Sequence, residues 1–315
     1  MKKFAIVALK GLGWLVLALV LLFLSWAAFN NKWVDAKPQP LNERLQAKAA
    51  SVAPEKNAFF GLLALTGPGE PIEAGRAQWA LQRVGDTPPS DGKSWIEAEP
   101  WRCSSDKVVC VEQWAGQHEA VAALLQKDSE WGERCAALAA PGMGFEEGRP
   151  DFTISFMKLN ATRPSQSTAV RCTRWLLAQA AVAAERRQLD ESMRRLEQSD
   201  RFVRMTLTGS NSLISHAIAW HNARLQWQTV AALAARHPAW ARERAAQFDA
   251  LLRPLPEEAL VPHRWISFEA AYGRSAVNEI AGGCSNEQTR QVRFWNESNA
   301  ELWLSCGVGL GFMAN

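Results

Sequence analysis

Two polar residues stand out as candidates for acid–base chemistry, Glu269 and His221. Glu269 lies in the apolar stretch SFEAAYGR, near Tyr272, the only tyrosine of the chain. An apolar environment can raise the pKa of a carboxyl until it acts as an acid. An ion pair with Arg274 is the simpler account, and we favour it. His221 follows Trp220, and a lone histidine more often serves structure than catalysis. Both residues are therefore weak catalytic candidates.

The recognised catalytic and cofactor motifs are incomplete in this chain. Gly92-Lys93-Ser94 resembles the end of a phosphate-binding loop, but Thr87 stands where the first glycine is needed. His216 and His221 are five positions apart, so they do not share a helix face as zinc-binding histidines four apart would. No G-x-S-x-G elbow is present. We expect no cofactor and no metal, and the sequence favours a protein that is not an enzyme.

The first 31 residues predict a transmembrane signal anchor. Lys2, Lys3 and Lys10 precede a run from Gly11 to Asn31 that has no charged residue. About 20 apolar residues span the ~30 Å hydrocarbon layer of a bilayer. The residues expected to form this anchor include Trp14, Leu17, Leu21, Phe23 and Trp26.

The lysines also predict the orientation of the anchor, because positive residues flanking a span stay in the cytoplasm. The rest of the chain would then lie in the periplasm, attached to a bacterial inner membrane by a single pass. A cleaved signal peptide is the alternative, with Ser25 and Ala27 at the spacing of a cleavage site. The length of the apolar run favours the retained anchor.

All six cysteines lie in the part expected to be exported, where disulfides can form. Cys103 and Cys110 are close in a loop-like stretch, and we expect a local bridge between them. Cys284 and Cys306 can form a second one. The two others, Cys135 and Cys172, lie in apolar helical contexts that suit buried thiols equally well. No cysteine pair has the spacing of a zinc site.

The apolar pattern after the anchor predicts an all-α domain. Residues 32–54 contain three prolines and are expected to be a linker, followed by one mostly helical exported domain at 55–315. Helical periodicity predicts the clearest helices at 168–187, 188–205, 211–236 and 238–252, with further helices at 71–83, 117–139 and 262–280. We expect most of the 15 tryptophans to fill the helical core.

Charge argues against one class of partner. Three of the 35 basic residues precede Asn31 and all 32 acidic residues follow it, so the charges balance from Lys32 onward. A neutral domain is a poor nucleic-acid binder, because neutralising phosphates supplies most of that affinity. We expect no nucleic acid among the partners of the protein.

The succession of short-linked helices in the middle of the chain loosely resembles a helical-hairpin solenoid of the tetratricopeptide type, although no regular period of 34 residues is present. The chain also resembles a set of uncharacterised proteobacterial envelope proteins with one N-terminal membrane anchor. The stretches NAFFGLLALTGP, EAGRAQW, WGERCAALAAP and RFWNESNAELW carry that resemblance. It implies an inner-membrane protein with an exported domain, and it assigns no functional residues.

These observations predict a scaffold that binds a protein or peptide of the cell envelope, since stacked helices form extended binding surfaces. The alternative is a membrane-tethered enzyme that acts on cell-wall or lipid material. Tryptophan richness and export motivate that alternative, with Glu269 as its acid.

Overall fold

The computed structural model describes residues 13–25, 52–82, 110–148, 166–260 and 264–273. These segments are mainly helical and contain no β-strand, only an isolated parallel bridge between Asn57 and Gly144. The all-α prediction is therefore confirmed for this part of the chain. By its contacts the chain divides into one unit of residues 43–270 and another of residues 1–42 with 271–315.

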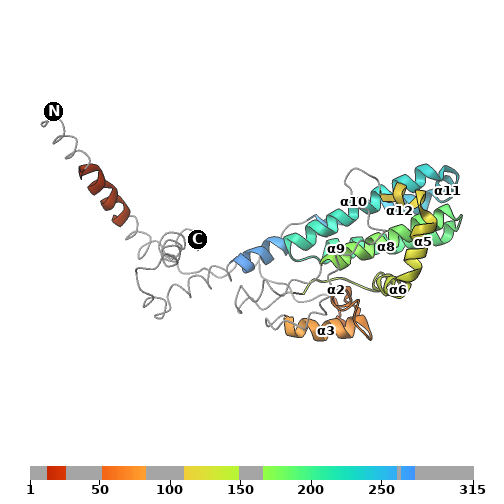
Figure 1. Cartoon of the computed structure of the whole chain (residues 1–315), viewed down its shortest axis with the longest axis horizontal. Coiled ribbons are helices and arrows are strands. Elements are labelled where there is room, and N and C mark those ends of the chain that lie inside the picture. Colours follow the sequence, from red (N-terminus) through yellow and green to blue (C-terminus); the bar gives the residue numbers. More distant parts are fainter. Residues whose placement is uncertain (1–12, 26–51, 83–109, 149–165, 261–263, 274–315) are drawn as a thin grey trace, which may run out of the picture. The chain divides into compact units, whose positions relative to one another are not determined.

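Helices follow one another through the unit of residues 43–270, joined by short turns where the connections are described (Figure 1). They are η2 (Pro54–Lys56), α2 (Ala58–Leu63), α3 (Pro71–Gln82), α4 (Cys110–Gly116), α5 (His118–Lys127), α6 (Ser129–Leu138), α8 (Gln166–Glu185), α9 (Leu189–Gly209), α10 (Leu213–Arg236), α11 (Pro238–Glu243), α12 (Ala245–Leu252) and η3 (Glu257–Ala259). A further helix occupies residues 264–273.

Helix α8 is the centre of this unit. It contacts α4, α5 and α6 as well as the long helices α9 and α10, and Figure 1 shows α8, α9 and α10 running side by side. Its residues 175–178 and 180–184 are all buried. A helix that is apolar on every face belongs inside a core. Neighbours therefore surround α8, whereas in a solenoid each repeat contacts only the next.

Most predicted helices are confirmed within a few residues, and two are divided. The helix expected at 117–139 is interrupted at Asp128, which ends α5 and precedes α6. The helix expected at 238–252 is interrupted at Arg244, between α11 and α12. Both α5 and α6 contact α8. The break at Asp128 therefore lets this part of the chain change direction and stay packed against α8. Residues 274–280 of the last predicted helix lie outside the described residues.

The tryptophan prediction is confirmed only in part, because four of the nine tryptophans in the described residues are buried: Trp79, Trp114, Trp175 and Trp240. One close crossing is between α6 and α8. A Cβ added at Gly132 would lie only 1.8 Å from the Trp175 ring, so only glycine lets the two helices approach this closely.

A disulfide joins α6 to α8 through Cys135 and Cys172, whose Cα atoms are 5.4 Å apart. The sequence left a buried thiol and a disulfide as alternatives for these two cysteines, and the disulfide is the one present, because the crossing of the helices brings them together. Cys110 is also disulfide-bonded, and its partner lies outside the described residues. Cys103, Cys284 and Cys306 lie outside them as well, so their pairing stays a prediction.

The part of the expected anchor that the structure describes is the helix of residues 13–25. Trp14, Leu17, Leu21 and Phe23 are exposed on it, and Trp26 lies outside the described residues. Within the described segments, none of the helices combines the length and apolar character needed to cross a membrane. Residues 32–51 of the expected linker are outside the described segments, and η2 begins at Pro54.

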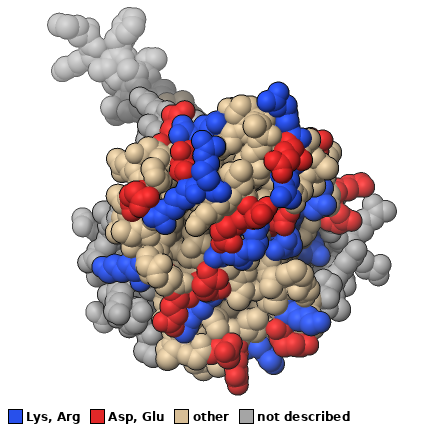
Figure 2. Space-filling view, turned by 90° about the vertical axis from the view of Figure 1, so that its right-hand side faces the viewer, with Lys and Arg blue, Asp and Glu red and all other residues tan. Residues whose placement is uncertain are grey.

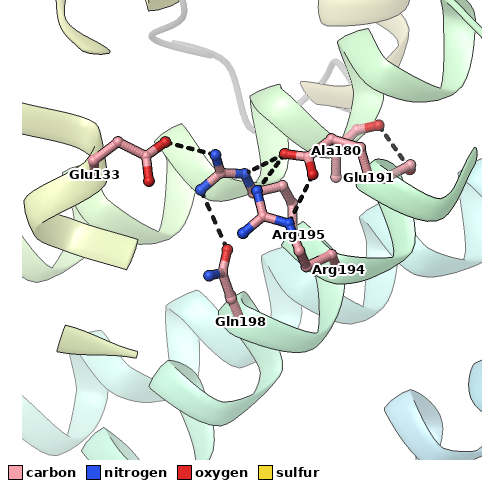
Figure 3. Close-up of polar contacts among 7 residues, drawn as sticks. Glu133, Ala180, Glu191, Arg194, Arg195 and Gln198 are labelled. Atoms are coloured by element: carbon pink, nitrogen blue, oxygen red, sulfur yellow. Dashed lines mark hydrogen bonds and ion pairs between the residues drawn. The ribbon is translucent and has the colours of Figure 1, made fainter. Parts of the chain in front are cut away.

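Many charged side chains on the helical unit form ion pairs with one another. On the face shown in Figure 2, Lys and Arg are interspersed with Asp and Glu. Figure 3 shows the best-connected cluster, in which buried Arg195 of α9 binds Glu133 of α6 at 2.6 Å and Glu191 at 2.8 Å. Its guanidinium also lies 5.2 Å from the centre of the Trp175 ring. Arg195 therefore ties α6 and α9 together above α8.

Candidate ligand pocket

Residues 144–148, which we call the strap, connect two distant parts of the helical unit. At its start, Ala58 N donates to Gly144 O at 2.8 Å and Gly144 N donates to Lys56 O at 2.9 Å. The side chain of Asn57 binds both the N–H and the C=O of Glu146, each at 2.9 Å. At its end, Glu147 N donates to Gly209 O at 3.0 Å. The strap therefore joins the beginning of α2 to the junction between α9 and α10.

The side chain of Glu147 caps the N-terminus of α10. Its carboxylate accepts from the backbone N–H groups of Asn211 and Ser212 at 2.6 and 2.7 Å. It also accepts from the hydroxyls of Ser212 and Ser215 at 2.9 and 2.6 Å. A helix N-terminus attracts negative charge, because its first N–H groups are unpaired and its dipole is positive there. Burial of this carboxylate, which is 5% exposed as a residue, is offset by these four bonds.

The two catalytic candidates lie elsewhere on the helices. Glu269 accepts a hydrogen bond from the backbone N–H of Leu213 at 2.9 Å, so it is a second carboxylate at the start of α10. This contact gives Glu269 a structural role, while its expected partner Arg274 lies outside the described residues. His221 is exposed on α10, two turns further along. Neither residue lines the pocket described next, and the structure does not bring them together into a site.

A small pocket lies beside the strap, within the unit of residues 43–270. Its volume is about 40 Å³, and one side opens to solvent. Residues from α2, the strap and α10 form its apolar walls, chiefly Phe59, Leu62, Leu63, Phe145 and Ile218. Polar residues of the strap and of helices α9 and α10 complete the lining: Glu147, Thr206, Ser210, Ser215 and Asn222.

The polar lining is almost fully engaged in hydrogen bonds, with one exception. Thr206 and Ser210 donate their hydroxyls to carbonyls of α9, and Ser215 donates to Glu147. Asn222 is 0% exposed, and neither its amide nitrogen nor its amide oxygen has a partner within the described residues. Buried amides are normally paired, since each unpaired group is unfavourable by about 1–3 kcal/mol. Asn222 therefore places an unpaired donor and acceptor in the core beside the pocket, both shielded from solvent.

These groups suit binding better than catalysis. The lining holds no His, Cys, Lys, Arg or Asp. Glu147 is its sole charged residue, and its four lone-pair sites already accept hydrogen bonds. The hydroxyls of Thr206, Ser210 and Ser215 and the carboxylate of Glu147 are thus all engaged in hydrogen bonds within the protein.

His216 lies one residue from Ser215 and next to the pocket in sequence. Its Nε2 accepts a hydrogen bond from the indole of Trp220 at 3.0 Å, so this nitrogen carries no proton. Burial lowers the pKa of His216, because the imidazolium form would lose hydration, while a hydrogen bond to the backbone of Leu207 acts in the opposite direction. The neutral form of His216 therefore orients Trp220, whose ring contacts that of Trp227 edge to face.

Other places for a ligand are weaker. An open groove between α6 and the turn at Gly67 contains Arg134, but this guanidinium already binds Gly67 O at 2.6 Å and Glu130 at 3.0 Å. Within the described segments, no three His, Cys, Asp or Glu side chains gather in an arrangement that could hold a metal ion.

Sequence reasoning located one part of this site and missed two. Ser212, between two helices predicted from the sequence, is the N-cap of α10, and its hydroxyl accepts from Ser215 N at 3.2 Å. Glu147 was missed, because nothing local marks a residue whose partners are more than 60 positions away. Asn222 carries a signal that could have been used, since it lies among Ala219, Ala223 and other residues of the buried face of α10.

Comparison with known proteins identifies no relative: no family model, no curated protein and no solved structure matches this chain.

Proposed function

We propose that this protein is a non-enzymatic binding protein of the bacterial cell envelope, a helical scaffold that holds a peptide or protein partner at the inner membrane. The observation that carries the proposal is the pocket beside the strap. It combines apolar walls with a few polar groups of α9, α10 and the strap. Pockets of this composition, mostly apolar with a few polar groups, are typical of ligand sites.

Two observations support the envelope location. The apolar side chains of residues 13–25 are exposed along their helix, and such a surface is unfavourable in water but favourable in lipid. The Cys135–Cys172 disulfide suits an oxidising compartment such as the periplasm. We therefore propose a retained single-pass anchor at residues 11–31, with the N-terminus in the cytoplasm and the helical unit in the periplasm.

The enzymatic alternative receives less support. It requires a polar group in the pocket that is free to transfer a proton, and Glu147 is held by four donors. Glu269, the acid considered from the sequence, accepts a hydrogen bond from the backbone N–H of Leu213 and does not line the pocket. The arrangement favours recognition over turnover.

The proposal is tested by crosslinking the tagged full-length protein in cells and identifying what is bound by mass spectrometry. Ile218→Trp places a large ring at the mouth of the pocket, where Ile218 is half-buried. Ala217→Trp is the matched control, because it adds the same ring to an exposed neighbouring position on α10. Circular dichroism of both purified variants establishes that they are folded.

We expect a reproducible partner that is lost from Ile218→Trp and retained by Ala217→Trp. A partner captured equally by both variants would remove the pocket from the proposal. If crosslinking of the unaltered protein recovers nothing, the scaffold function is wrong, and cell-wall fragments and lipids become the substrates to screen.

A further inference from the structure

We propose that the pocket beside the strap binds an aliphatic side chain of a peptide partner, either the isopropyl group of a valine or the branched end of a leucine. This inference rests on the proposed function and specifies which part of the partner occupies the same pocket. The rest of the partner lies outside the mouth of the pocket, where Ile218 and the exposed Ile214, one turn earlier on α10, form a continuous apolar surface.

The polar groups of the lining offer a ligand no free hydrogen-bond donor. Thr206 and Ser210 donate their hydroxyls to carbonyls of α9, and Ser215 donates to Glu147, whose carboxylate already accepts from four donors. Both polar atoms of the Asn222 amide are shielded, so a group in the pocket does not reach them. A polar group that enters therefore loses its hydration without gaining equivalent hydrogen bonds, which is unfavourable.

The part of the lining that solvent reaches is mainly apolar. Its walls are formed by Phe59, Leu62 and Leu63 of α2, by Phe145 of the strap and by Ile218 of α10. Apolar contact with such walls is favourable in proportion to the area removed from water, and it requires no hydrogen bond. The lining therefore favours an aliphatic group over any group that carries a charge or an amide.

The size of the pocket distinguishes among apolar groups. A volume of about 40 Å³ holds roughly three water-sized groups, since one water needs about 10–15 Å³ in this measure. The three carbons of an isopropyl group match this capacity. A benzene ring or an indole is too large to enter completely, and a single methyl group leaves most of the pocket unfilled.

The same volume favours a peptide over a lipid as the source of the aliphatic group. An acyl chain placed here would bury only its last few carbons and leave the rest of its length in water. A peptide inserts one short side chain, and its neighbouring residues cover Ile214, which is 41% exposed. The occupant is therefore a valine or leucine within an apolar stretch of a partner.

The test uses the full-length protein in lipid nanodiscs and ligand-observed NMR with capped amino acids as probes. N-acetyl-leucinamide and N-acetyl-valinamide carry the proposed groups, and the corresponding alanine, phenylalanine and asparagine compounds are the matched controls. We expect the leucine and valine probes to bind with a Kd in the millimolar range, as suits ligands of this size. The controls should bind at least ten times more weakly, because they bury less apolar surface, do not fit, or lose hydration.

Two variants change the pocket itself. Ala169→Leu adds an aliphatic group to the lining from α8, so it should abolish binding of the leucine probe. Ala217→Leu is its matched control, because it makes the same change at an exposed position of α10 that does not line the pocket, and the Kd should be unchanged. Leu63→Ala enlarges the pocket and should let the phenylalanine probe bind at least as tightly as the leucine probe.

Thermal unfolding separates a filled pocket from a damaged fold. Filling a cavity commonly raises stability, so Ala169→Leu should leave the melting temperature unchanged or raise it by up to about 4 °C. If the added side chain instead prevents folding, the change of preference in Leu63→Ala still tests the pocket, because Leu63 is only partly buried.

Several results would overturn the inference. They are no saturation with the leucine probe, equal binding of the leucine and alanine probes, preference for the asparagine probe, or a leucine Kd that a folded Ala169→Leu leaves unchanged. Tighter binding of octanamide than of the leucine probe would assign the pocket to a lipid chain. Dimerisation of the unaltered protein that Ile218→Trp abolishes would assign it to a second copy. If the probes fail while Ile218→Trp still loses its partner in cells, the proposed function stands and the aliphatic assignment alone is wrong.

Discussion

The surroundings of α8 and the surroundings of the strap are held together by different forces. Around α8 the contacts are apolar and continuous, from Trp175 to Ala184, with charge pairs such as Arg195 and Glu133 at the edge. Around the strap, side chains bind backbone groups far away in sequence, as Asn57 binds Glu146 and Glu147 binds Asn211. The first region tolerates approximate geometry, whereas the second depends on individual hydrogen bonds.

The comparison indicates a division of roles. Apolar burial supplies most of the stability of a fold, and it does so without fixing one particular side chain. A network of buried polar groups contributes less net stability but specifies a unique local geometry. The pocket lies in the second kind of region, where precise positions matter for recognition.

The largest effect is expected in the apolar region, from Trp175→Ala. Trp175 is completely buried between α6 and α8, and truncating such a ring should lower the free energy of unfolding by about 3–5 kcal/mol. Urea titration followed by circular dichroism measures the change. Trp220→Ala is the control, with an expected loss of about 1 kcal/mol or less because Trp220 is 36% exposed. Equal losses would show that the α8 core is not the main source of stability.

The next effect is expected at the strap, from Glu147→Gln. The amide places an NH₂ group against donors that now bind a carboxylate oxygen, and we expect the free energy of unfolding to fall by about 2–3 kcal/mol. Glu146→Gln is the matched control, since the amide oxygen of Gln can still accept from the backbone N–H of Val52, as the carboxylate does at 3.2 Å. Its change should be within about 0.5 kcal/mol. If both variants behave alike, the polar network does not hold the strap.

A smaller effect is expected where the two kinds of interaction meet, at Arg195 (Figure 3). Arg195→Met keeps most of the packing on Trp175 but removes the bonds to Glu133 and Glu191, and both carboxylates remain partly solvated. We expect a loss of about 1–2 kcal/mol in chemical denaturation. Arg194→Met should change the free energy of unfolding by no more than about 0.5 kcal/mol, because Arg194 is exposed and its ion pair with Glu191 is a surface pair.

The smallest effect depends on pH and concerns His216. Its pKa is lowered in the folded state from an ordinary value of 6.5, so the unfolded chain takes up a proton first as the pH falls below 6.5. Stability is therefore complete above 6.5 and declines until the pH passes the folded pKa. We expect the melting temperature to fall less in His216→Gln than in the unaltered protein between about pH 7.5 and pH 5.5. An identical fall would show that His216 does not contribute.

The same comparison explains which parts of the structure the sequence could predict. Helices α8, α9 and α10 were predicted within a few residues, because their apolar positions repeat with helical periodicity. The breaks at Asp128 and Arg244 were not predicted, since neither position carries a proline or glycine to mark the end of a helix. The pairing of Cys135 with Cys172 follows from the crossing of two helices, which periodicity does not define.

The candidate site was harder to predict than the fold. The hydrogen-bond donors to the carboxylate of Glu147 lie 64 to 68 positions further along the chain. The donor to Glu269 lies 56 positions earlier. No pattern of spacing within either segment carries that information. Asn222 differs, because a polar residue on the buried face of an otherwise suitable helix is an anomaly that the sequence itself displays.

The long-range bonds of the strap also imply an order of events during folding. The α8–α9 hairpin closes over few residues, whereas the bonds of Asn57 to Glu146 and of Glu147 to Asn211 span 89 and 64 positions. Closing longer loops loses more entropy, so these bonds form after the hairpin does. The same bonds can open without disrupting the α8 core, which makes the strap a separate unit of local unfolding. Backbone amides of Asn211 and Ser212 should therefore exchange with deuterium sooner than those in the middle of α8, and a partner bound in the pocket should slow them.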